Sequence, residues 1–300
     1  MKKPLLRFML VSDMHYSVEE KDIAEVSSLP NVNVSYAAGS AFGYTQKEKI
    51  DKITEAAAAE NSALSLNALL VLGDLSIDDY DFRNLPLNYC ERFKRECMDI
   101  LPCPSYAIAG NHDSHPNSEW QRIFGYDRQF SVEFGDTAFI MLDTFNNVAK
   151  SASGAAYTPV DMAFLKKKLE DHKGKRIFLC AHHFDLIKDS EDFYSTVRES
   201  KDIVALFRGH THCPEIIKTD LLGNKPLIDI GGYAYKGVEL PDGRYTFLVF
   251  DESIAWGYQI VEMYENRCVI YHHTPAIDYK GENGSFSVEE KISAKIEITL

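Results

Sequence analysis

The chain has 300 residues, of which 45% are hydrophobic and 12% aromatic. That length and apolar content predict a packed globular core and exclude a disordered chain. The formal net charge is −13, whereas a protein that grips the nucleic-acid backbone needs a surplus of Lys and Arg, so we expect no nucleic-acid partner. A phosphate-handling site stays compatible with this charge if bound cations reverse the local field.

The N-terminal segment, residues 1–11, resembles a secretion signal at first sight, because two lysines precede an apolar run. That run is short, Arg7 interrupts it and no small-residue cleavage site follows, so we interpret it as a buried strand. No stretch reaches the ~18 apolar residues of a membrane span, and we expect no membrane partner. Six cysteines without a C-x-x-C pair are typical of reduced thiols, which favours a cytoplasmic location.

Short apolar runs alternate with helical patterns over the first two thirds of the chain. We expect strands at residues 5–11, 68–72, 105–109, 130–134, 137–142, 176–181 and 203–207. We expect helices at residues 47–61, 89–100 and 190–200. A further helix is expected with Thr158 as its cap, Pro159 at its first position and Gly174 just past its end.

From residue 215 the pattern changes to one strand after another. These strands are expected at residues 215–219, 226–230, 245–250, 257–263 and 268–272. Alternation of strands and helices followed by a strand-rich tail predicts an α/β fold with mixed sheets and helices outside. We expect a single domain over residues 1–300, with a core at about 1–235 and a β-rich C-terminal part at about 236–300.

Polar side chains follow five of the expected strands, at the point where each strand ends. These clusters are Asp13-Met14-His15, Gly73-Asp74, Gly110-Asn111-His112-Asp113, His182-His183 and Gly209-His210-Thr211-His212. Ligands of open α/β sheets bind outside the carboxyl ends of the strands, so the clusters are expected to converge. Each cluster alone has an ordinary interpretation as a turn, a helix cap or a histidine pair. One shared site explains the five together better than five coincidences do.

The donor atoms in these clusters are those of a metal site. Imidazoles, carboxylates and one amide, without a thiolate, are typical ligands of Mn, Fe, Zn or Co rather than of a cysteine-based structural zinc. The candidate ligands are Asp13, His15, Asp74, Asn111, His182, His210 and His212. Seven ligands are too many for one catalytic ion, so we expect two divalent or trivalent ions that share a carboxylate.

In this order the five motifs resemble the calcineurin-like metallophosphoesterase superfamily, over residues 5–212. The resemblance implies a metallophosphoesterase fold, in which two mixed β-sheets pack as a sandwich flanked by helices, here with a β-rich C-terminal extension. It implies one ion bound by Asp13, His15 and His212, and another bound by Asn111, His182 and His210. Asp74 would bridge the two ions.

The sequence departs from the family pattern in two places. Ile77 stands where many members carry an acid or an amide. Many members also have proline two residues after the first histidine of the fourth motif, where this chain has Phe184. We take His182 rather than its neighbour His183 as the ligand, on the resemblance alone.

The resemblance implies hydrolysis of a phosphoester by a hydroxide that bridges the two ions. His112 is similar to the family histidine that faces the substrate, and we expect it to protonate the leaving oxygen or stabilise the transition state. We expect Asp113 to orient the His112 ring. The lack of an obvious Arg cluster favours a phosphodiester over a phosphomonoester. A phosphomonoesterase, a metal-dependent nuclease and a non-catalytic protein-binding scaffold are the alternatives.

The substrate is expected to be a small-molecule phosphoester. The stretch of residues 16–44 follows the first motif directly and is expected to overhang the site. Its aromatic rings either stack on an aromatic leaving group or pack on the protein body: Tyr16, Tyr36, Phe42 and Tyr44. His115 and Tyr233 are further candidates for substrate contact. The strand-rich C-terminal third offers an edge for a homo-oligomer.

Overall fold

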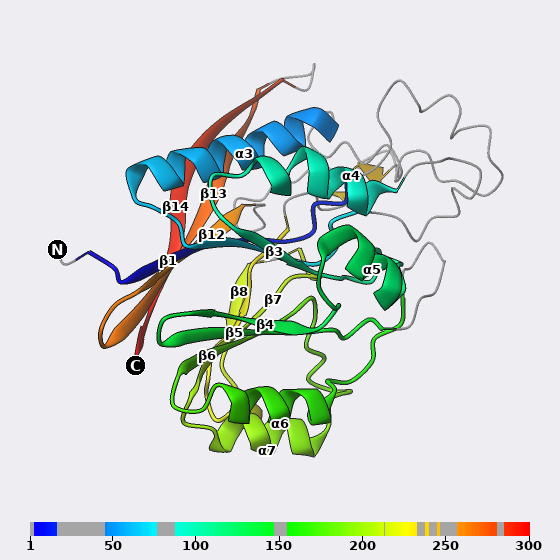
Figure 1. The fold of residues 1–300 in the computed structure, drawn as a ribbon. Helices are drawn as coiled ribbons and strands as arrows, with labels where there is room; N and C mark the ends of the chain where they lie inside the picture. The colour runs from blue at the N-terminus through cyan, green and yellow to red at the C-terminus, as the bar shows by residue number, and fades with distance from the viewer. Residues whose placement is uncertain are drawn as a thin grey trace.

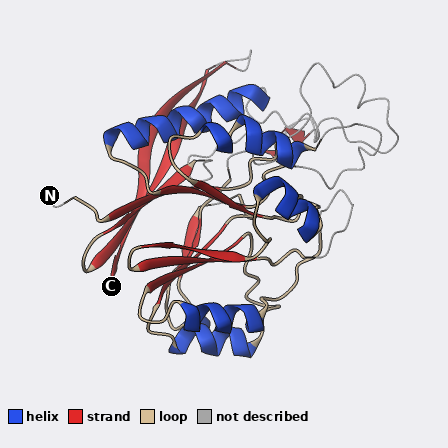
Figure 2. Ribbon diagram, in the orientation of Figure 1, coloured by secondary structure: helices blue, strands red, loops and turns tan. Residues whose placement is uncertain are grey.

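The structure is a computed structural model that describes residues 3–16, 46–76, 88–146, 155–212, 214–232, 238–239, 245–246, 257–280 and 285–300. Two β-sheets face each other at its centre, and helices cover the outer face of each sheet (Figure 1). Colouring by secondary structure shows the same layers, helix, sheet, sheet and helix (Figure 2). This arrangement confirms the predicted fold class of two mixed sheets flanked by helices.

The first sheet contains six strands in the order β14-β13-β12-β1-β2-β3. They are β1 (Leu6–Val11), β2 (Ala68–Leu72), β3 (Ser105–Ile108), β12 (Tyr258–Met263), β13 (Arg267–Lys280) and β14 (Ser285–Thr299). β1, β2 and β3 run parallel, and β12 pairs antiparallel with β1 on its other side. The strand-rich C-terminal part of the chain therefore completes this sheet.

The second sheet has the order β4-β5-β6-β7-β9-β8. Its strands are β4 (Phe130–Phe134), β5 (Thr137–Leu142), β6 (Arg176–Ala181), β7 (Ile203–Arg208), β8 (Glu215–Ile217) and β9 (Leu227–Asp229). β5, β6, β7 and β9 are parallel, and the edge strands β4 and β8 are antiparallel to their neighbours. A separate pair is formed by β10 (Val238–Glu239) and β11 (Tyr245–Thr246).

Five α-helices of the described chain lie outside the sheets. Beside the first sheet are α3 (Gln46–Ala63), α4 (Tyr89–Glu96) and α5 (Asn117–Phe124), and beside the second are α6 (Met162–Asp171) and α7 (Glu191–Glu199) (Figure 1). Two 3₁₀ turns are η3 (Met98–Ile100) and η4 (Asp220–Leu222). No described helix is both long enough and apolar enough to cross a bilayer.

Side chains of the central strands alternate between two cores, as the pleat of a strand requires. Phe8 and Leu10 of β1 pack in the core between the sheets. Met9 and Val11 pack with residues of α3, α4 and α5. A third core lies between the second sheet and the helices α6 and α7. The parallel strands are thus buried on both faces, which leaves their ends as the places for polar side chains.

The helix expected to begin at Pro159 begins at Met162 instead. Asp161 is its N-cap, because the Asp161 side chain accepts hydrogen bonds from two backbone N–H groups of the first turn. Thr158 lies in the preceding loop. The sequence-based predictions also missed α5 and β14. α5 is only two turns long, and β14 is the second strand of the β13–β14 hairpin and is rich in polar residues.

Substitution of Phe178 tests the packing of the core between the sheets. It is fully buried, and its ring centroid lies 5.2 Å from that of Phe139 and 5.6 Å from that of Phe207. We expect Phe178→Ala to lower the free energy of unfolding by about 3–5 kcal/mol, measured by urea denaturation. Ile187→Ala is the control, because that side chain is 93% exposed. Equal losses in the two variants would contradict the placement of Phe178.

Candidate metal centre

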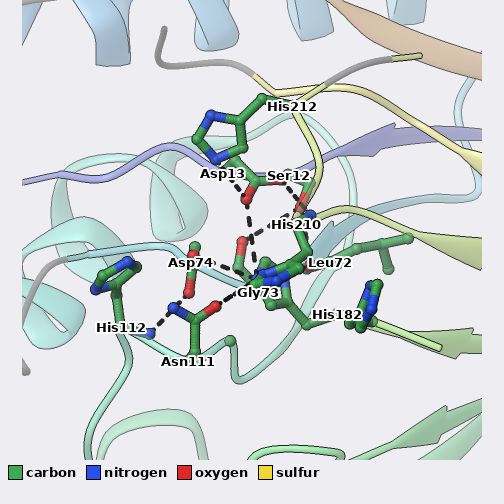
Figure 3. Close-up of polar contacts among 12 residues, drawn as sticks. Ser12, Asp13, Leu72, Gly73, Asp74, Asn111, His112, His182, His210 and His212 are labelled. Atoms are coloured by element: carbon green, nitrogen blue, oxygen red, sulfur yellow. Dashed lines mark hydrogen bonds and ion pairs between the residues drawn. The ribbon is translucent and has the colours of Figure 1, made fainter. Parts of the chain in front are cut away.

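The five polar clusters lie together at one rim of the molecule. Each follows a parallel strand: β1, β2 and β3 of the first sheet, and β6 and β7 of the second. Figure 3 shows side chains from all five clusters directed toward one another. The seven predicted ligands are thereby gathered from segments up to 199 positions apart, Asp13 to His212.

One group of donors consists of Asp13, His15 and His212. Their ligand atoms all lie within 4.8 Å of one another. The Nε2 atoms of His15 and His212 are 3.2 Å apart, and Asp13 Oδ1 is 3.2 Å from His212 Nε2. Asp13 and His15 are buried, and His212 is half-buried. Two imidazoles and a carboxylate converge here as they do around a metal ion.

The second group consists of Asn111, His182 and His210. Asn111 Oδ1 lies 2.9 Å from His210 Nδ1 and 3.2 Å from His182 Nε2. His182 Nδ1 lies 2.7 Å from the carbonyl oxygen of Leu72, which can only accept, so Nδ1 carries the hydrogen. In the neutral ring the Nε2 lone pair then points at the other donors. Such a carbonyl contact behind a histidine is the usual way to orient a metal ligand.

Asp74 faces both groups. Its Oδ2 atom is 3.2 Å from His182 Nε2 and 3.7 Å from His15 Nε2. Its Oδ1 atom accepts a hydrogen bond from the backbone N–H of His112 at 2.9 Å. The carboxylate is 2% exposed, so water does not screen it. Asp74 thus stands where the sequence analysis expects a carboxylate shared by two ions.

Five ligand-type residues have a backbone conformation that residues other than glycine rarely adopt. Six non-glycine residues of the described chain have positive φ, and five of them are Asp13, His15, Asp74, His210 and His212, with φ between 44° and 73°. A non-glycine residue in the left-handed region costs free energy and clusters at functional sites. The backbone is therefore strained where the candidate ligands stand, and packing around the rim holds it there.

Glycines allow the ligand segments to approach one another. A Cβ atom on Gly110 would lie 2.1 Å from Asp74 Oδ1, and one on Gly209 would lie 2.6 Å from Asp13 Oδ2. A Cβ atom on Gly73 would lie 2.5 Å from His182 Nδ1. Real Cβ atoms do not come so close, so glycine is required before three of the ligand clusters.

The charges at the rim favour a bound cation. Burial alone would raise the pKa of Asp13, but His212 and His182 lower it to about 2. Burial alone would lower the pKa of His182, but Asp74 and Asp13 outweigh it and raise that pKa to about 10. Asp13 and Asp74 are thus two buried, ionised carboxylates in one site. They need positive charge nearby, which a proton or a metal ion provides.

The imidazoles of His15 and His210 suit metal ligation. Burial lowers the pKa of His15 well below its usual value, and burial with His182 lowers the pKa of His210 to about 4. These rings are neutral near pH 7 and their lone pairs are available. Nitrogen and oxygen donors in two groups, with Asp74 between them, fit two metal ions of the kind expected from the sequence.

His112 and Asp113 are adjacent in sequence but make separate contacts. The His112 ring lies edge-on to that of His15, with centroids 5.2 Å apart. The buried Asp113 carboxylate accepts hydrogen bonds from the backbone N–H groups of Leu75, Ser76 and Gly110. These contacts occupy the Asp113 carboxylate with backbone groups, and its orientation of the His112 ring stays a prediction. Asp113 ties together the loops after β2 and β3, and is a positioning residue.

Asp229 supports the fifth cluster, and the sequence reasoning missed it. It is fully buried at the end of β9, and its Oδ2 accepts hydrogen bonds from Thr211 Oγ1 at 2.7 Å and from Arg208 Nε at 3.0 Å. Thr211 stands between two candidate ligands, so Asp229 fixes the turn that carries both. The signal in the sequence is an expected strand that ends near Asp229 and Gly231, by analogy with the other five clusters.

The predicted substrate contacts have different outcomes. Tyr16 is 2% exposed, and its hydroxyl donates to Glu96, so its ring lies in the core instead of on an open rim. His115 is half-buried, close to His112 in the chain. Tyr44 and Tyr233 fall outside the described residues, as do Tyr36 and Phe42. His183 lies beside His210, with ring centroids 4.6 Å apart.

Comparisons with known proteins bear on the family. Residues 6–214 match the family model described as calcineurin-like phosphoesterase. A dimetal phosphatase from Danio rerio is 14% identical with a TM-score of 0.57, over 89% of this chain and 96% of that chain. The structure of PhoD is 7% identical with a TM-score of 0.57, over 99% of this chain and 70% of that chain. Curated proteins give no significant match.

Gly110→Ala tests the close approach at the rim without removing any ligand. The new Cβ atom would collide with Asp74 Oδ1, so we expect the variant to retain clearly less metal than the wild type after dialysis, measured by elemental analysis. Gly135→Ala is the control, because Gly135 has positive φ but no atom within 4 Å of the added Cβ. Equal metal content in all three proteins would argue against the assigned ligand cluster.

Proposed function

This chain belongs to the calcineurin-like phosphoesterase family, and we propose that it hydrolyses phosphate esters at a centre of two metal ions. The observation that carries the proposal is the position of Asp74, whose Oδ2 lies between His182 and His15, one from each group of donors. We assign Asp13, His15 and His212 to one ion. We assign Asn111, His182 and His210 to the other, with Asp74 shared.

Two such ions, when bound, supply a hydroxide nucleophile and neutralise charge on the phosphoryl oxygens. The protein prepares for them with two buried carboxylates and with His15 and His210, whose lowered pKa values keep the rings neutral near pH 7. The Leu72 carbonyl fixes the tautomer of His182. The backbone N–H of His210 donates a hydrogen bond to Asp13 Oδ2 at 3.0 Å, which orients the Asp13 carboxylate. These contacts hold the donors before any ion arrives, and so lower the cost of forming the site.

His112 is placed to act on the leaving group. Its backbone is anchored to Asp74, and its ring stands next to His15 without belonging to either set of assigned ligands. In Figure 3 the His112 ring lies on the opposite side of Asp74 from His182. His112 as a whole residue is buried, with 8% of its surface exposed. We propose that it donates a proton to the departing oxygen.

The neighbouring arginines support a diester substrate. Arg128 is paired with Asp143, and Arg208 with Asp229, and both guanidinium groups are buried. Neither is therefore free to bind the two charges of a phosphomonoester, which Arg side chains usually capture in a bidentate manner. We propose a small-molecule phosphodiester as the substrate class.

His112→Ala tests whether His112 is the general acid that protonates the leaving oxygen. We expect turnover to fall by a factor on the order of 10²–10⁴, because proton transfer to the leaving oxygen is lost. Metal content should match that of the wild type, since His112 is not an assigned ligand. Activity would be measured with Mn²⁺ present and metal by elemental analysis. Wild-type turnover in this variant would remove His112 from the mechanism.

Two chromogenic substrates test the substrate class. We expect a higher kcat/KM on bis(4-nitrophenyl) phosphate than on 4-nitrophenyl phosphate, because no arginine of the described rim is available for a second charge. Both rates would be measured side by side with Mn²⁺. A strong preference for the monoester would overturn the diester assignment but leave the metal centre standing. No hydrolysis of either ester by the metal-loaded protein would count against the proposed function itself.

A further inference from the structure

A buried ion pair at the edge of the second sheet lies beside the candidate metal centre. Arg128 precedes β4 and is 4% exposed, and Asp143 follows β5 and is 7% exposed. Arg128 Nε lies 2.7 Å from Asp143 Oδ2, and its Nη2 lies 3.1 Å from Asp143 Oδ1. This is a bidentate pair with a fixed geometry. Burial of two charges is costly, so the pair calls for a local reason.

Arg128 also binds three backbone carbonyl groups. Its Nη1 donates to the carbonyl oxygens of His115 at 2.6 Å and Asp113 at 3.3 Å. Its Nη2 donates to the carbonyl oxygen of Phe145 at 2.8 Å. A guanidinium group has five N–H donors, and with Asp143 each of them has an acceptor. Lysine, with three donors on one atom, cannot span these groups.

These carbonyl groups belong to two segments of the rim. Asp113 and His115 directly follow His112, in the loop after β3 of the first sheet. Phe145 follows β5 of the second sheet, and its ring packs on His182 and His210 with centroid distances of 5.5 and 5.6 Å. One side chain thus sets both the loop that carries His112 and an aromatic wall of the metal centre.

The Asp113 carboxylate accepts hydrogen bonds from backbone N–H groups of the loops after β2 and β3. The place of the His112 ring also depends on the backbone that carries it. That backbone is held on one side by Asp74, through the His112 N–H, and on the other side by Arg128. Loss of the second anchor would let the loop shift relative to the second sheet.

We propose that Arg128, held by Asp143, is a positioning residue that sets the place of the leaving-group acid His112. The proposal rests on the proposed function, because it assigns a role within that reaction. Arg128 does not touch the substrate or the ions. Its effect on catalysis comes through the backbone of residues 113–115, since displacement of a reacting group by about 1 Å can cost on the order of 10²-fold in rate.

Leaving groups of different basicity separate positioning from plain stability. Methyl 4-nitrophenyl phosphate releases a stable anion that needs little protonation, whereas methyl phenyl phosphate needs the acid more. We expect Arg128→Lys to lose on the order of 10²-fold in kcat on the phenyl ester and only a few-fold on the nitrophenyl ester. KM and metal content should stay near the wild-type values. Asp143→Asn, which loosens the same guanidinium group, should show the same pattern.

Arg7→Lys is the matched control. Arg7 is another buried arginine, 7% exposed, which pairs with Glu60 and Glu262 and donates to the carbonyl oxygens of Glu60 and Leu64. It lies near the start of β1, at the far end of that strand from Asp13. We expect Arg7→Lys to lower stability without changing the ratio of the two rates.

Combination with His112→Ala completes the test. In that background Arg128→Lys should cause little further loss on the phenyl ester, because the group that it positions is gone. Equal losses on both esters, additive losses in the double variant or reduced metal content in Arg128→Lys would overturn the proposal.

A second measurement does not depend on activity. The imidazole ¹⁵N signals of His112, assigned by their absence in His112→Ala, should move in Arg128→Lys and stay in place in Arg7→Lys. Unmoved signals would also overturn the proposal. An inactive wild type with shifted His112 signals in Arg128→Lys would instead sink the proposed function and leave the positioning role.

Discussion

The rim of this protein depends on Asp74, a carboxylate that is almost completely buried and faces histidines from two directions. An ionised carboxylate in such a place is costly unless positive charge and hydrogen bonds surround it. His182 and His15 lie beside one oxygen, and the His112 N–H donates to the other. Around this one group the loops after β1, β2, β3 and β6 have to meet, and the arrangement of the strands makes that meeting possible.

The two-sheet architecture sets the positions of the candidate metal ligands, and the loops that carry them are short. Each sheet contributes parallel strands whose carboxyl ends reach the same rim, so each polar cluster needs only a few residues beyond its strand. Aromatic rings between the sheets fix the spacing of the two halves. Arg128, held by Asp143 of the second sheet, adds a polar link between the same halves through the carbonyl groups of Asp113 and His115. The site is thus built on rigid elements, as precise constellations generally are.

Much of this arrangement could be predicted from the sequence. Strand ends followed by Asp, Asn and His are local patterns, and the convergence of parallel strand ends is a general rule. Contacts that depend on side-chain direction could not be predicted in the same way. Asp113 was expected beside the His112 ring, but in the folded loop its carboxylate turns to the backbone of Leu75 and Ser76. For Tyr16 the sequence left two positions open, stacking on a leaving group or packing on the protein body; a partner 80 positions away, Glu96, holds it in the core. Asp229 was overlooked because it acts through hydrogen bonds with Arg208 and Thr211 of the neighbouring strand and its loop. The spacing of residues along the sequence does not reveal such contacts.

The left-handed backbone at five candidate ligands affects how the sequence can change in evolution. Each such residue carries strain of about 1–3 kcal/mol, which glycine at the same position would largely relieve. If the protein has the proposed function, selection for activity maintains that strain. A descendant released from catalysis would become more stable as these positions drifted to glycine, with the strands and cores intact. The same backbone that prepares the rim for metal therefore makes loss of the metal an easy evolutionary step toward an inert protein of the same shape.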